Sequence, residues 1–456
     1  MKNVNFVVLA AGKGTRMKSS VPKVLHKLAG RSMLRHVIDA TKTVGESKKV
    51  IVTGHGAEQV EETFESADTK FVRQEDQLGT AHAVSMAIPE LCADAIVVVL
   101  YGDVPLIRPV TLQRMLASVN KKSMGLLTIS LDDADGYGRI VRSADGLIES
   151  IVEQKDATNE QRNICEINTG VMALTSSQLR NWLPQISNNN AQGEYYLTDI
   201  IAIARQNGIE VNSINPESVT EVEGVNSRLQ LSQLERAHQL ELAKQLMESG
   251  TTLADPARFD QRGQLSVGTD NFIDINCIFE GNVTIGSNVS IGPNCCIINS
   301  TIGNDVEILA NTIIDSSEVG DSAVIGPFAR IRPGTELAEH TKVGNFVETK
   351  KSQVGKGSKI NHLSYVGDSE LGENVNIGAG TITCNYDGVE KHKTLLGDGV
   401  FVGSNSTLVA PITVGNGGFI AAGSTITTKV PKDSLGVGRG KQRNIKGWQR
   451  PIKRED

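Results

Sequence analysis

The chain has 456 residues, of which 39% are hydrophobic, so its length suggests about three domains and its composition supports large apolar cores. A formal net charge of -6 gives no general attraction to polyphosphate, which makes nucleic acid a poor candidate partner. No apolar run approaches transmembrane length, and the opening FVVLAAG is too short for a signal peptide, so we expect no membrane partner. Six cysteines without CxxC or metal spacing fit a reducing compartment, and we interpret the protein as cytosolic (cytoplasmic).

The first stretch that indicates chemistry is an apolar strand over residues 5–10 followed by the glycine-rich AAGKGTRM. Its glycines predict a tight loop before a helix that follows Pro22, and backbone N–H groups in such a loop can bind phosphate. The spacing matches neither a Walker A loop nor GxGxxG, so the loop by itself does not distinguish phosphate binding from a plain βα turn. Lys13, Arg16 and Lys23 add three cations within reach of one phosphate chain.

The next apolar stretches, VIVTGH and AIVVVLYGDVPLI, alternate with helical stretches and predict a parallel α/β sheet. Ligands of such sheets bind at the C-terminal ends of the strands, and Asp103 follows the run that ends at Leu100. A carboxylate at this position can hold Mg²⁺ against phosphates, whereas Asp103 taken alone fits a turn aspartate better.

Five motifs then carry a resemblance: LAAGKGTRM, Pro22-Lys23, QLGTAHA, YGDVPL and GYGRI. As a set, over most of residues 1–228, they resemble the nucleotidyltransferases that make NDP-sugars from an NTP and a sugar 1-phosphate. The resemblance implies that Gln74 and Gly79 read a uracil edge, that Asp103 and Asn226 hold Mg²⁺, and that Arg16 and Lys23 assist catalysis. The residues implied to bind the nucleotide and the sugar are Leu9, Ala10, Ala11, Gly12, Lys23, Gln74, Gly79, Thr80, Tyr101, Gly102, Asp103, Gly138, Glu153, Asn168 and Asn226.

A linker helix is expected over residues 229–249, between a nucleotidyltransferase domain at 1–228 and a C-terminal domain at 250–456. Leucines at near-helical spacing run through this stretch, Asn226 or Ser227 can cap its start, and Gly250 ends it. His238 has no second histidine, cysteine or carboxylate cluster to support a metal site, so we interpret it as a partly exposed helix residue.

From Val267 to Ile426 the chain falls into units of about six residues that open on an aliphatic residue, such as IGSNVS and VGKGSK. Short units recur in every third place, so successive triplets predict three-sided coils, with the aliphatic residue and a small residue four places later pointing inward. Glycine in second place is expected to permit the corner geometry. An ordinary antiparallel β domain would show no such in-phase period. The run resembles the left-handed parallel β-helix of hexapeptide acyltransferases, and its handedness is taken from that resemblance.

Polar residues of this run predict a second site. The insertion TCNYDGVEKHKTL interrupts the repeat between residues 383 and 396, so we expect a projecting loop of the kind that maps to a binding face. His362, grouped with Tyr365 in the unit INHLSY, is the acid–base candidate; the alternative is a solvated surface histidine. Six residues from six successive coils are expected to form a ladder along one corner, roughly 25 Å tall: Arg332, Lys350, His362, Ala379, Ser404 and Ala422.

The whole chain, with both halves in this order, resembles the bifunctional N-acetylglucosamine-1-phosphate uridylyltransferase / glucosamine-1-phosphate N-acetyltransferase family. The resemblance implies acetylation of glucosamine 1-phosphate by acetyl-CoA in the C-terminal half, with His362 as general base. It then implies uridylyl transfer from UTP to N-acetylglucosamine 1-phosphate in the N-terminal half, giving UDP-N-acetylglucosamine for cell-wall synthesis, and it implies a homotrimer. The implied acetyltransferase residues are Arg332, Lys350, Tyr365, Asn376, Asn385 and Tyr386 for the acceptor and Ala379, Ser404, Ala422 and Arg439 for acetyl-CoA.

Other interpretations stay open on the residues alone. The β-helix could serve allostery or assembly in a single-activity sugar nucleotidyltransferase, or it could be a scaffold without a ligand; a scaffold needs neither the loop nor the His362 ladder. Cys384 could suggest an acyl-enzyme, but nothing pairs it with a base, so we interpret it as a bystander. The basic tail from Arg439 to Arg454 fits a solvated terminus, and its Arg and Trp could also clamp coenzyme phosphates and adenine.

Overall fold

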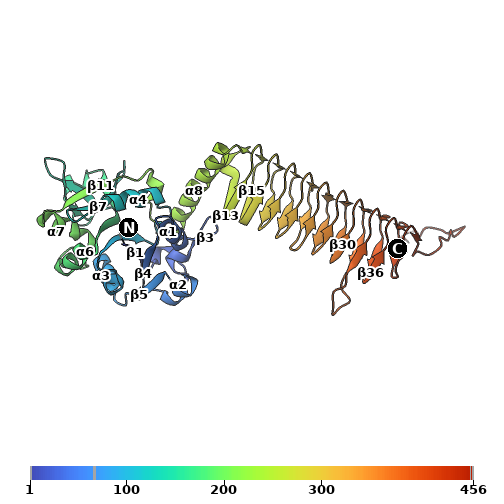
Figure 1. Ribbon diagram of the computed structural model, residues 1–456, viewed down its shortest axis with the longest axis horizontal. Coiled ribbons are helices and arrows are strands. Elements are labelled where there is room, and N and C mark those ends of the chain that lie inside the picture. The colour runs from blue at the N-terminus through green and yellow to red at the C-terminus, as the bar shows by residue number, and fades with distance from the viewer. Residues whose placement is uncertain (1–2, 65–67, 452, 454–456) are drawn as a thin grey trace. The chain divides into compact units, whose positions relative to one another are not determined.

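The computed structural model of the protein describes residues 3–64, 68–451 and 453 (Figure 1). It divides into two compact units, one ending at His238 and the other beginning at Gln239. Among the helices of the described residues, none has both the length and the apolar character that crossing a membrane requires.

The N-terminal unit is built on a nine-stranded sheet with the order β11-β7-β10-β6-β1-β4-β5, extended by β8 and β9. The prediction of a parallel sheet is correct for β1, β4, β5 and β6 but not for β10, which runs antiparallel to both β6 and β7. After β7 the chain returns to the same end of that strand, where Leu131 N–H donates to Cys165 O at 3.0 Å. Strand β10 therefore starts beside the end of β7 and runs in the opposite direction. The strands are β1 (Asn3–Ala10), β4 (Ser47–Thr53), β5 (Thr69–Arg73), β6 (Ala95–Tyr101), β7 (Ser123–Ser130), β8 (Arg139–Arg142), β9 (Ile148–Val152), β10 (Glu166–Thr175) and β11 (Glu210–Ile214).

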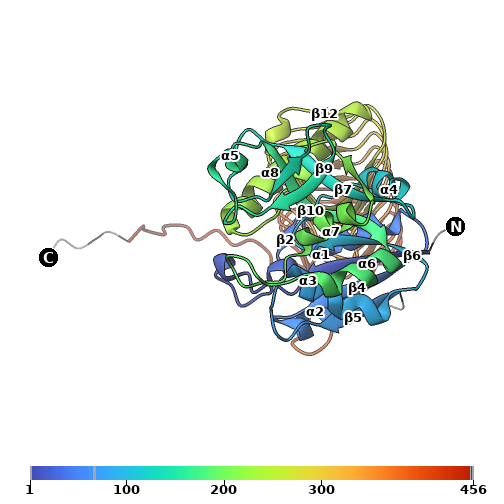
Figure 2. The ribbon, with the colours of Figure 1, turned by 90° about the vertical axis from the view of Figure 1, so that its left-hand side faces the viewer.

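Helices cover both faces of this sheet (Figure 2). One core packs α3, α6 and α7 against residues such as Val7 and Val97, and the other packs α1, α2 and α4 against the alternate residues, such as Phe6 and Val98. This alternation follows from the two-residue period of a strand. The helices are α1 (Met33–Lys42), α2 (Ala57–Phe64), α3 (Thr80–Ala87), α4 (Pro109–Ala117), α5 (Asn159–Arg162), α6 (Ser176–Trp182) and α7 (Ile200–Gln206).

The helix expected directly after Pro22 begins later, at Met33. Pro22 is followed by the short 3-10 helix η2 (Lys23–Leu25) and by a hairpin of β2 (Lys27–Leu28) and β3 (Arg31–Ser32). Ala29 and Gly30 form its two-residue turn with φ of 47° and 79°, the geometry that two-residue hairpins favour. Ser32 then caps α1 by accepting a hydrogen bond from Arg35 N–H at 3.4 Å.

The helix expected near residues 229–249 is α8 (Arg228–Glu248), and the division between the two units falls inside it. Ser227 Oγ accepts from Gln230 N–H at 3.2 Å and so caps its start. Leu234 of α8 is buried in a core cluster of the first unit, whereas Ala243 and Leu246 are buried in the core of the second. Each end of the helix therefore belongs to the unit on which it packs.

The C-terminal unit is a three-walled coil of parallel strands, the predicted left-handed parallel β-helix. The long strands β13 (Phe259–Val267) and β15 (Cys277–Ile285) each cover two walls at its start. The first wall holds β18 (Thr301–Ile302), β21 (Glu318–Val319), β24 (Glu336–Leu337), β27 (Gln353–Val354), β30 (Ser369–Leu371), β33 (Thr394–Leu396) and β36 (Ile412–Val414). The second wall holds β12 (Thr252–Leu253), β14 (Phe272–Ile273), β16 (Ser290–Ile291), β19 (Glu307–Ile308), β22 (Val324–Ile325), β25 (Lys342–Asn345), β28 (Lys359–His362), β31 (Asn376–Ile377), β34 (Phe401–Val402), β37 (Phe419–Ile420) and β39 (Leu435–Gly436). The third wall holds β17 (Cys296–Ile298), β20 (Ile313–Asp315), β23 (Arg330–Ile331), β26 (Glu348–Lys350), β29 (Tyr365–Gly367), β32 (Ile382–Cys384), β35 (Thr407–Val409) and β38 (Thr425–Ile426).

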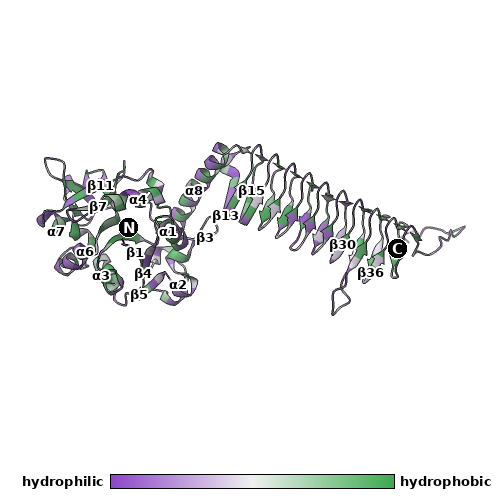
Figure 3. Ribbon diagram, viewed as in Figure 1, coloured by the Kyte–Doolittle hydropathy of each residue, from purple (hydrophilic) through white to green (hydrophobic). Residues whose placement is uncertain are grey.

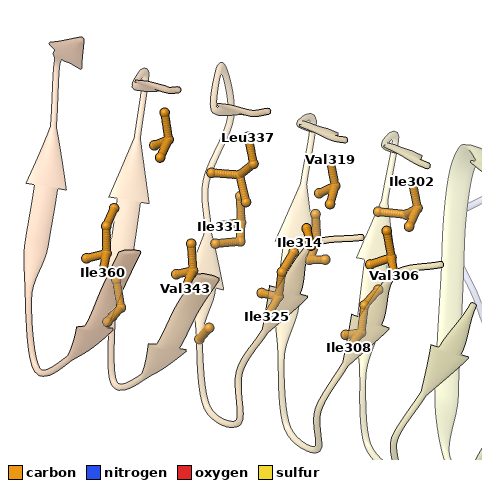
Figure 4. Close-up of a cluster of buried hydrophobic side chains, with 14 of the residues drawn as sticks. Ile302, Val306, Ile308, Ile314, Val319, Ile325, Ile331, Leu337, Val343 and Ile360 are labelled. Atoms are coloured by element: carbon orange, nitrogen blue, oxygen red, sulfur yellow. The ribbon is translucent and has the colours of Figure 1, made fainter. Parts of the chain in front are cut away.

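The inside of the coil confirms the predicted inward positions. Opening aliphatics such as Ile302, Ile308 and Ile325 are buried, and so is Val306, four places after Ile302 (Figure 4). Thr312, four places after Ile308, is also buried. Hydrophobic and hydrophilic residues alternate along the strands (Figure 3), because successive side chains point to opposite faces of a wall. The stacked apolar column holds the coils together.

Glycine in the second place of a unit has a different role from the one expected. Gly286 and Gly303 do not adopt positive φ; a Cβ on Gly286 would lie 2.7 Å from the carbonyl oxygen of Gly303 on the next coil. Glycine is needed there because adjacent coils approach closely. The left-handed backbone falls two residues further on, at positions such as Asn288 (φ 58°) and Asp305 (φ 57°), where Asn and Asp tolerate it.

Candidate active sites

The first candidate site lies where the C-terminal ends of three parallel strands meet. The register pairs Leu9 of β1 with Val52 of β4 and with Tyr101 of β6, so these ends share one edge of the sheet. A cavity of about 280 Å³ opens at this edge. Its lining brings together the predicted residues Leu9, Ala10, Ala11, Gly12, Lys23, Gln74, Gly79, Thr80, Tyr101 and Asp103. Gly102 lies beside it, donating its N–H to Leu9 O at 2.9 Å.

Lys23, Asp103 and Asn226 form a polar cluster in this cleft. The Lys23 ammonium donates to Asp103 Oδ2 and, at 3.1 Å, to Asn226 Oδ1. Val225 N–H donates to the Asp103 carbonyl at 2.9 Å and so fixes Asn226 beside Asp103. A carboxylate and an amide oxygen that already converge on one cation are a donor set that suits Mg²⁺ together with phosphate oxygens. These residues therefore fit the predicted metal.

Gln74 and Gly79 shape the part of the cleft predicted to bind the nucleoside. Gln74 is only 4% exposed, and its Nε2 donates to Gly79 O at 3.1 Å. Gly79 has φ of 117°, and a Cβ on it would lie 2.6 Å from Tyr195 O, so only glycine fits. Thr80 Oγ1 accepts from Leu197 N–H at 3.0 Å, which ties this loop to the segment after residue 194.

The residues predicted to bind the sugar are Tyr101, which lines the cavity, and Gly138, Glu153 and Asn168. A Cβ on Gly138 would lie 3.4 Å from Glu153 Oε1, and Asn168 N–H donates to Gly138 O at 2.9 Å. Burial raises the pKa of Glu153, while a 3.1 Å hydrogen bond from Thr198 Oγ1 opposes that shift. Burial also raises the pKa of Tyr101, with Asp103 and Glu153 adding to the effect, so this phenol stays neutral.

Two of the predicted cations lie outside the cavity lining, and the lining includes residues that were not predicted. Lys13 and Arg16 are exposed on the loop and in η1 (Thr15–Met17), outside the cavity lining, so a catalytic role for Arg16 stays a prediction. Gln77 and Glu194 line the cavity although no role was predicted for them, and Gln77 Nε2 donates to Ala11 O at 2.6 Å. Gln77 opens the quoted motif QLGTAHA, whereas only folding brings Glu194 here.

The second candidate site lies on the coil, where the repeat is interrupted. Asn385 begins the projecting loop between β32 and β33, and its Nδ2 donates to Asp368 Oδ2 and, at 3.5 Å, to Tyr365 Oη. Tyr386 is 58% exposed in the loop and pairs with Lys391 through a β-bridge. The interruption of the repeat therefore projects as predicted.

A group of cations lies at this edge of the third wall. Arg332 follows β23 and Lys350 ends β26, which pair in register. Lys391 of the loop, and then Arg332, lower the pKa of Lys350, since each adds positive charge beside it. Arg332 Nη1 also donates to Glu348 Oε1 at 2.5 Å. Such a cluster suits a phosphate group, and Lys391 is a member that sequence reasoning missed.

His362 lies at the other edge of the third wall. It ends β28, directly beside Asn345 of β25, and its Nδ1 lies 2.7 Å from Asn345 Oδ1. Because an amide oxygen can only accept, Nδ1 carries the hydrogen of this bond, and in a neutral imidazole Nε2 is then the acceptor nitrogen. His362 is exposed, so this geometry is compatible with the predicted role as a base.

The predicted six-residue ladder divides between two corners of the coil. His362, Ala379, Ser404 and Ala422 do stack at the corner after the second wall, whereas Arg332 and Lys350 lie at the corner after the third. Tyr365 also differs from its assignment, because it begins β29 on the third wall instead of completing a unit of the second. Backbone hydrogen bonds connect the four stacked positions: Gly380 N–H to His362 O at 3.3 Å, Asn405 N–H to Ala379 O at 2.8 Å and Gly423 N–H to Ser404 O at 2.8 Å.

The remaining predicted residues lie on or near the stacked corner. Asn376 is half-buried on β31 of the second wall. Arg439 follows β39 and its Nη1 donates to Ala422 O at 2.7 Å, beside the predicted coenzyme positions. The tail beyond it is exposed as far as residue 451, and residues 452 and 454 of the predicted basic tail lie outside the described residues.

Comparison with known proteins matches both units. A MobA-like NTP transferase domain model matches residues 6–166, and a GMPPB C-terminal domain model matches residues 262–354. The chain is 58% identical over 453 residues to "Bifunctional protein GlmU" of Marinobacter nauticus and 55% identical over 451 residues to that of Cellvibrio japonicus, with 99% of this chain and 100% of each relative covered. Among solved structures, a UDP-glucose pyrophosphorylase complexed with UDP-glucose is similar at 17% sequence identity and a TM-score of 0.44. The match covers 52% of this chain and 98% of the chain of that structure.

High identity over the full length leaves no room for a single-activity enzyme or an inert scaffold. The relatives extend through both the cleft of the first unit and the coil of the second. The chain therefore belongs to the family of the bifunctional protein GlmU, the uridylyltransferase and acetyltransferase of UDP-N-acetylglucosamine biosynthesis.

Proposed function

We propose that the two reactions are divided between the two sites just described. The coil would acetylate the amine of glucosamine 1-phosphate with acetyl-CoA, and the cleft would then join the product to UTP with release of pyrophosphate. The observation that carries this proposal is that the two sets of predicted site residues lie in different units. The cleft lies in the first unit, whereas His362 and the cation cluster lie in the second.

Uridylyl transfer in the cleft needs no covalent group from the protein. A phosphate oxygen of N-acetylglucosamine 1-phosphate attacks the α-phosphorus of UTP in line, and pyrophosphate leaves. Asp103 and Asn226 would hold Mg²⁺, which would supply neutralising charge to the phosphates, and Lys23 and Arg16 add positive charge. The convergence of both oxygens on the Lys23 ammonium supports this assignment. Positioning and electrostatics then supply the catalysis.

Acetyl transfer on the coil uses His362 as the general base. Its Nε2 takes a proton from the sugar amine as the nitrogen attacks the thioester carbonyl; the C–S bond then breaks, and the imidazolium returns that proton to the sulfur, so coenzyme A leaves as the thiol. Asn345 keeps the hydrogen on Nδ1, which supports this role. Arg332 and Lys350, with Tyr365, Asn376, Asn385 and Tyr386, hold the acceptor. The coenzyme lies along Ala379, Ser404, Ala422 and Arg439.

The distance between the two edges of the third wall supports a homotrimer. His362 ends β28 at one edge of this wall, β29 crosses the wall, and Arg332 and Lys350 lie at the other edge. His362 and the cation cluster of one chain therefore lie at opposite edges of one wall and not side by side. Exposed apolar residues stand near His362, namely Phe328 (50%), Phe346 (56%) and Leu363 (61%). We propose that copies pack there, so that one chain brings His362 to the cation cluster of its neighbour.

Mixed assemblies test this arrangement. We expect chains with His362→Ala and chains with Lys350→Ala to be inactive alone in acetyl transfer and to regain part of the activity when co-expressed, because some interfaces then carry both intact residues. Coenzyme A release is the readout, and co-expression of two His362→Ala chains is the control. Activity confined to chains that are intact at both positions would contradict a shared site.

The full chain with all substrates tests the division of the reactions. Coenzyme A release and pyrophosphate release are followed in one sample, with and without EDTA. We expect EDTA to stop pyrophosphate release and to leave coenzyme A release unchanged, since only the cleft is assigned a metal. Loss of both signals would overturn the assignment. The six free thiols and these intracellular substrates also support a cytosolic location, which we propose on that basis.

A further inference from the structure

The amide of Gln74 is held by two partners at the back of the nucleotide cavity. Its Nε2 donates to Gly79 O at 3.1 Å and also lies 3.1 Å from His82 Nδ1. A carbonyl oxygen can only accept, so the nitrogen of the amide must face Gly79. Both hydrogens of Nε2 are then committed, one to the carbonyl and one to the imidazole. What Gln74 can still offer to a ligand in the cavity is its oxygen, Oε1.

This arrangement also fixes the state of His82. Because Gln74 Nε2 donates, His82 Nδ1 must accept, so the imidazole is neutral with its hydrogen on Nε2. His82 stands on α3, three residues after Gly79, and is half-buried behind the cavity lining. It lines a separate hollow with Ala81, Ser85 and Tyr195. His82 is therefore outside the nucleotide cavity and reaches it only through Gln74.

We propose that His82 is a positioning residue for base selection, which acts by holding the Gln74 amide with Oε1 toward the nucleobase. The inference rests on the proposed function, since it takes UTP as the substrate of this cleft. Uracil presents an N–H at N3, which Oε1 can accept, whereas cytosine presents an unprotonated N3 that would face Oε1 acceptor to acceptor. A free amide could turn over and offer Nε2 to cytosine. Two fixed hydrogens prevent that rotation.

Substitutions at His82 test the proposal in the full chain. We expect His82→Ala to lower the ratio of kcat/KM for UTP over CTP roughly five- to tenfold, the value of one hydrogen bond. The KM for UTP should rise, whereas the KM for N-acetylglucosamine 1-phosphate should not change. His82→Asn should keep most of the wild-type ratio, because an asparagine Oδ1 can replace the accepting Nδ1. Ser85→Ala, from the same helix and the same hollow, is the matched control and should keep the wild-type ratio.

Thermal unfolding of each variant, together with its acetyl transfer, checks that the chain is intact. Should His82→Ala unfold, His82→Leu takes its place, since leucine fills the space of the imidazole without an acceptor. An unchanged UTP to CTP ratio in His82→Ala would overturn the inference, and so would equal loss in His82→Ala and His82→Asn. A wild-type chain that releases no pyrophosphate from UTP would instead refute the proposed function of the cleft.

Discussion

Asp103 lies two residues after the end of β6, beside Lys23 and Asn226. Its position could be predicted from the sequence, because a polar residue after a buried strand lies at the ligand-binding edge of the sheet. Its partner Asn226 could not, since it lies on a segment distant in sequence that reaches the strand end only after folding. The resemblance to nucleotidyltransferases supplied that residue.

We expect Asp103→Ala to abolish pyrophosphate release and to leave acetyl transfer at the wild-type level, because the carboxylate is assigned to the metal of the cleft alone. Asp94→Ala is a matched control, since this exposed aspartate precedes the same strand β6 at its opposite end. Full turnover of Asp103→Ala at ordinary Mg²⁺ concentrations would remove Asp103 from the site.

We also expect His362→Ala to lose acetyl transfer by about 10²- to 10⁴-fold, the range of general base catalysis. Cys384→Ala should keep acetyl transfer, since the mechanism assigns no covalent intermediate to it. Coenzyme A release in single-turnover experiments separates the two variants. The opposite pattern, with Cys384 required and His362 dispensable, would replace direct transfer by an acyl-enzyme.

Among the elements, the walls of the coil are the most predictable from the sequence and the antiparallel strand β10 is the least. A period of about six residues fixes which aliphatics turn inward, because every coil repeats the same corner. The antiparallel course of β10 has no such periodic signal, and the sequence was therefore interpreted as a parallel sheet. Tyr365 was assigned to the wrong wall because a unit boundary lies within the strand that it begins.

The loop between β32 and β33 carries a testable electrostatic effect. Lys391 lowers the pKa of Lys350, so Lys350 loses its charge at a lower pH than an isolated lysine does. We expect the KM for glucosamine 1-phosphate to rise as pH approaches that lowered pKa. In Lys391→Ala this rise should begin at higher pH, although the KM near neutral pH should be higher because one cation is missing.

Lys393→Ala provides the matched control for Lys391→Ala, since Lys393 closes the same loop but pairs with Glu370. Its pH profile for glucosamine 1-phosphate should match that of the wild type. If both lysine variants changed the profile equally, the effect would reflect the general charge of the loop, and the specific contact between Lys391 and Lys350 would be excluded as its cause.

At the scale of the whole molecule, the chain has two units, and each contains the residues predicted to bind the substrates of one reaction. Helix α8 contributes to both cores, with Leu234 in the first and Ala243 in the second. Fragments 1–228 and 250–456, cut at the predicted boundaries, would each lose the part of α8 that packs in its core. Fragments 1–248 and 239–456 instead keep the packing of each unit intact.

The most direct test of two independent sites is to assay these two fragments for both reactions. We expect fragment 1–248 to release pyrophosphate from UTP and N-acetylglucosamine 1-phosphate and to show no acetyl transfer. Fragment 239–456 should release coenzyme A from acetyl-CoA and glucosamine 1-phosphate only when it assembles into trimers. Pyrophosphate release that appears only after the two folded fragments are mixed would contradict the account, because the cleft would then depend on the coil.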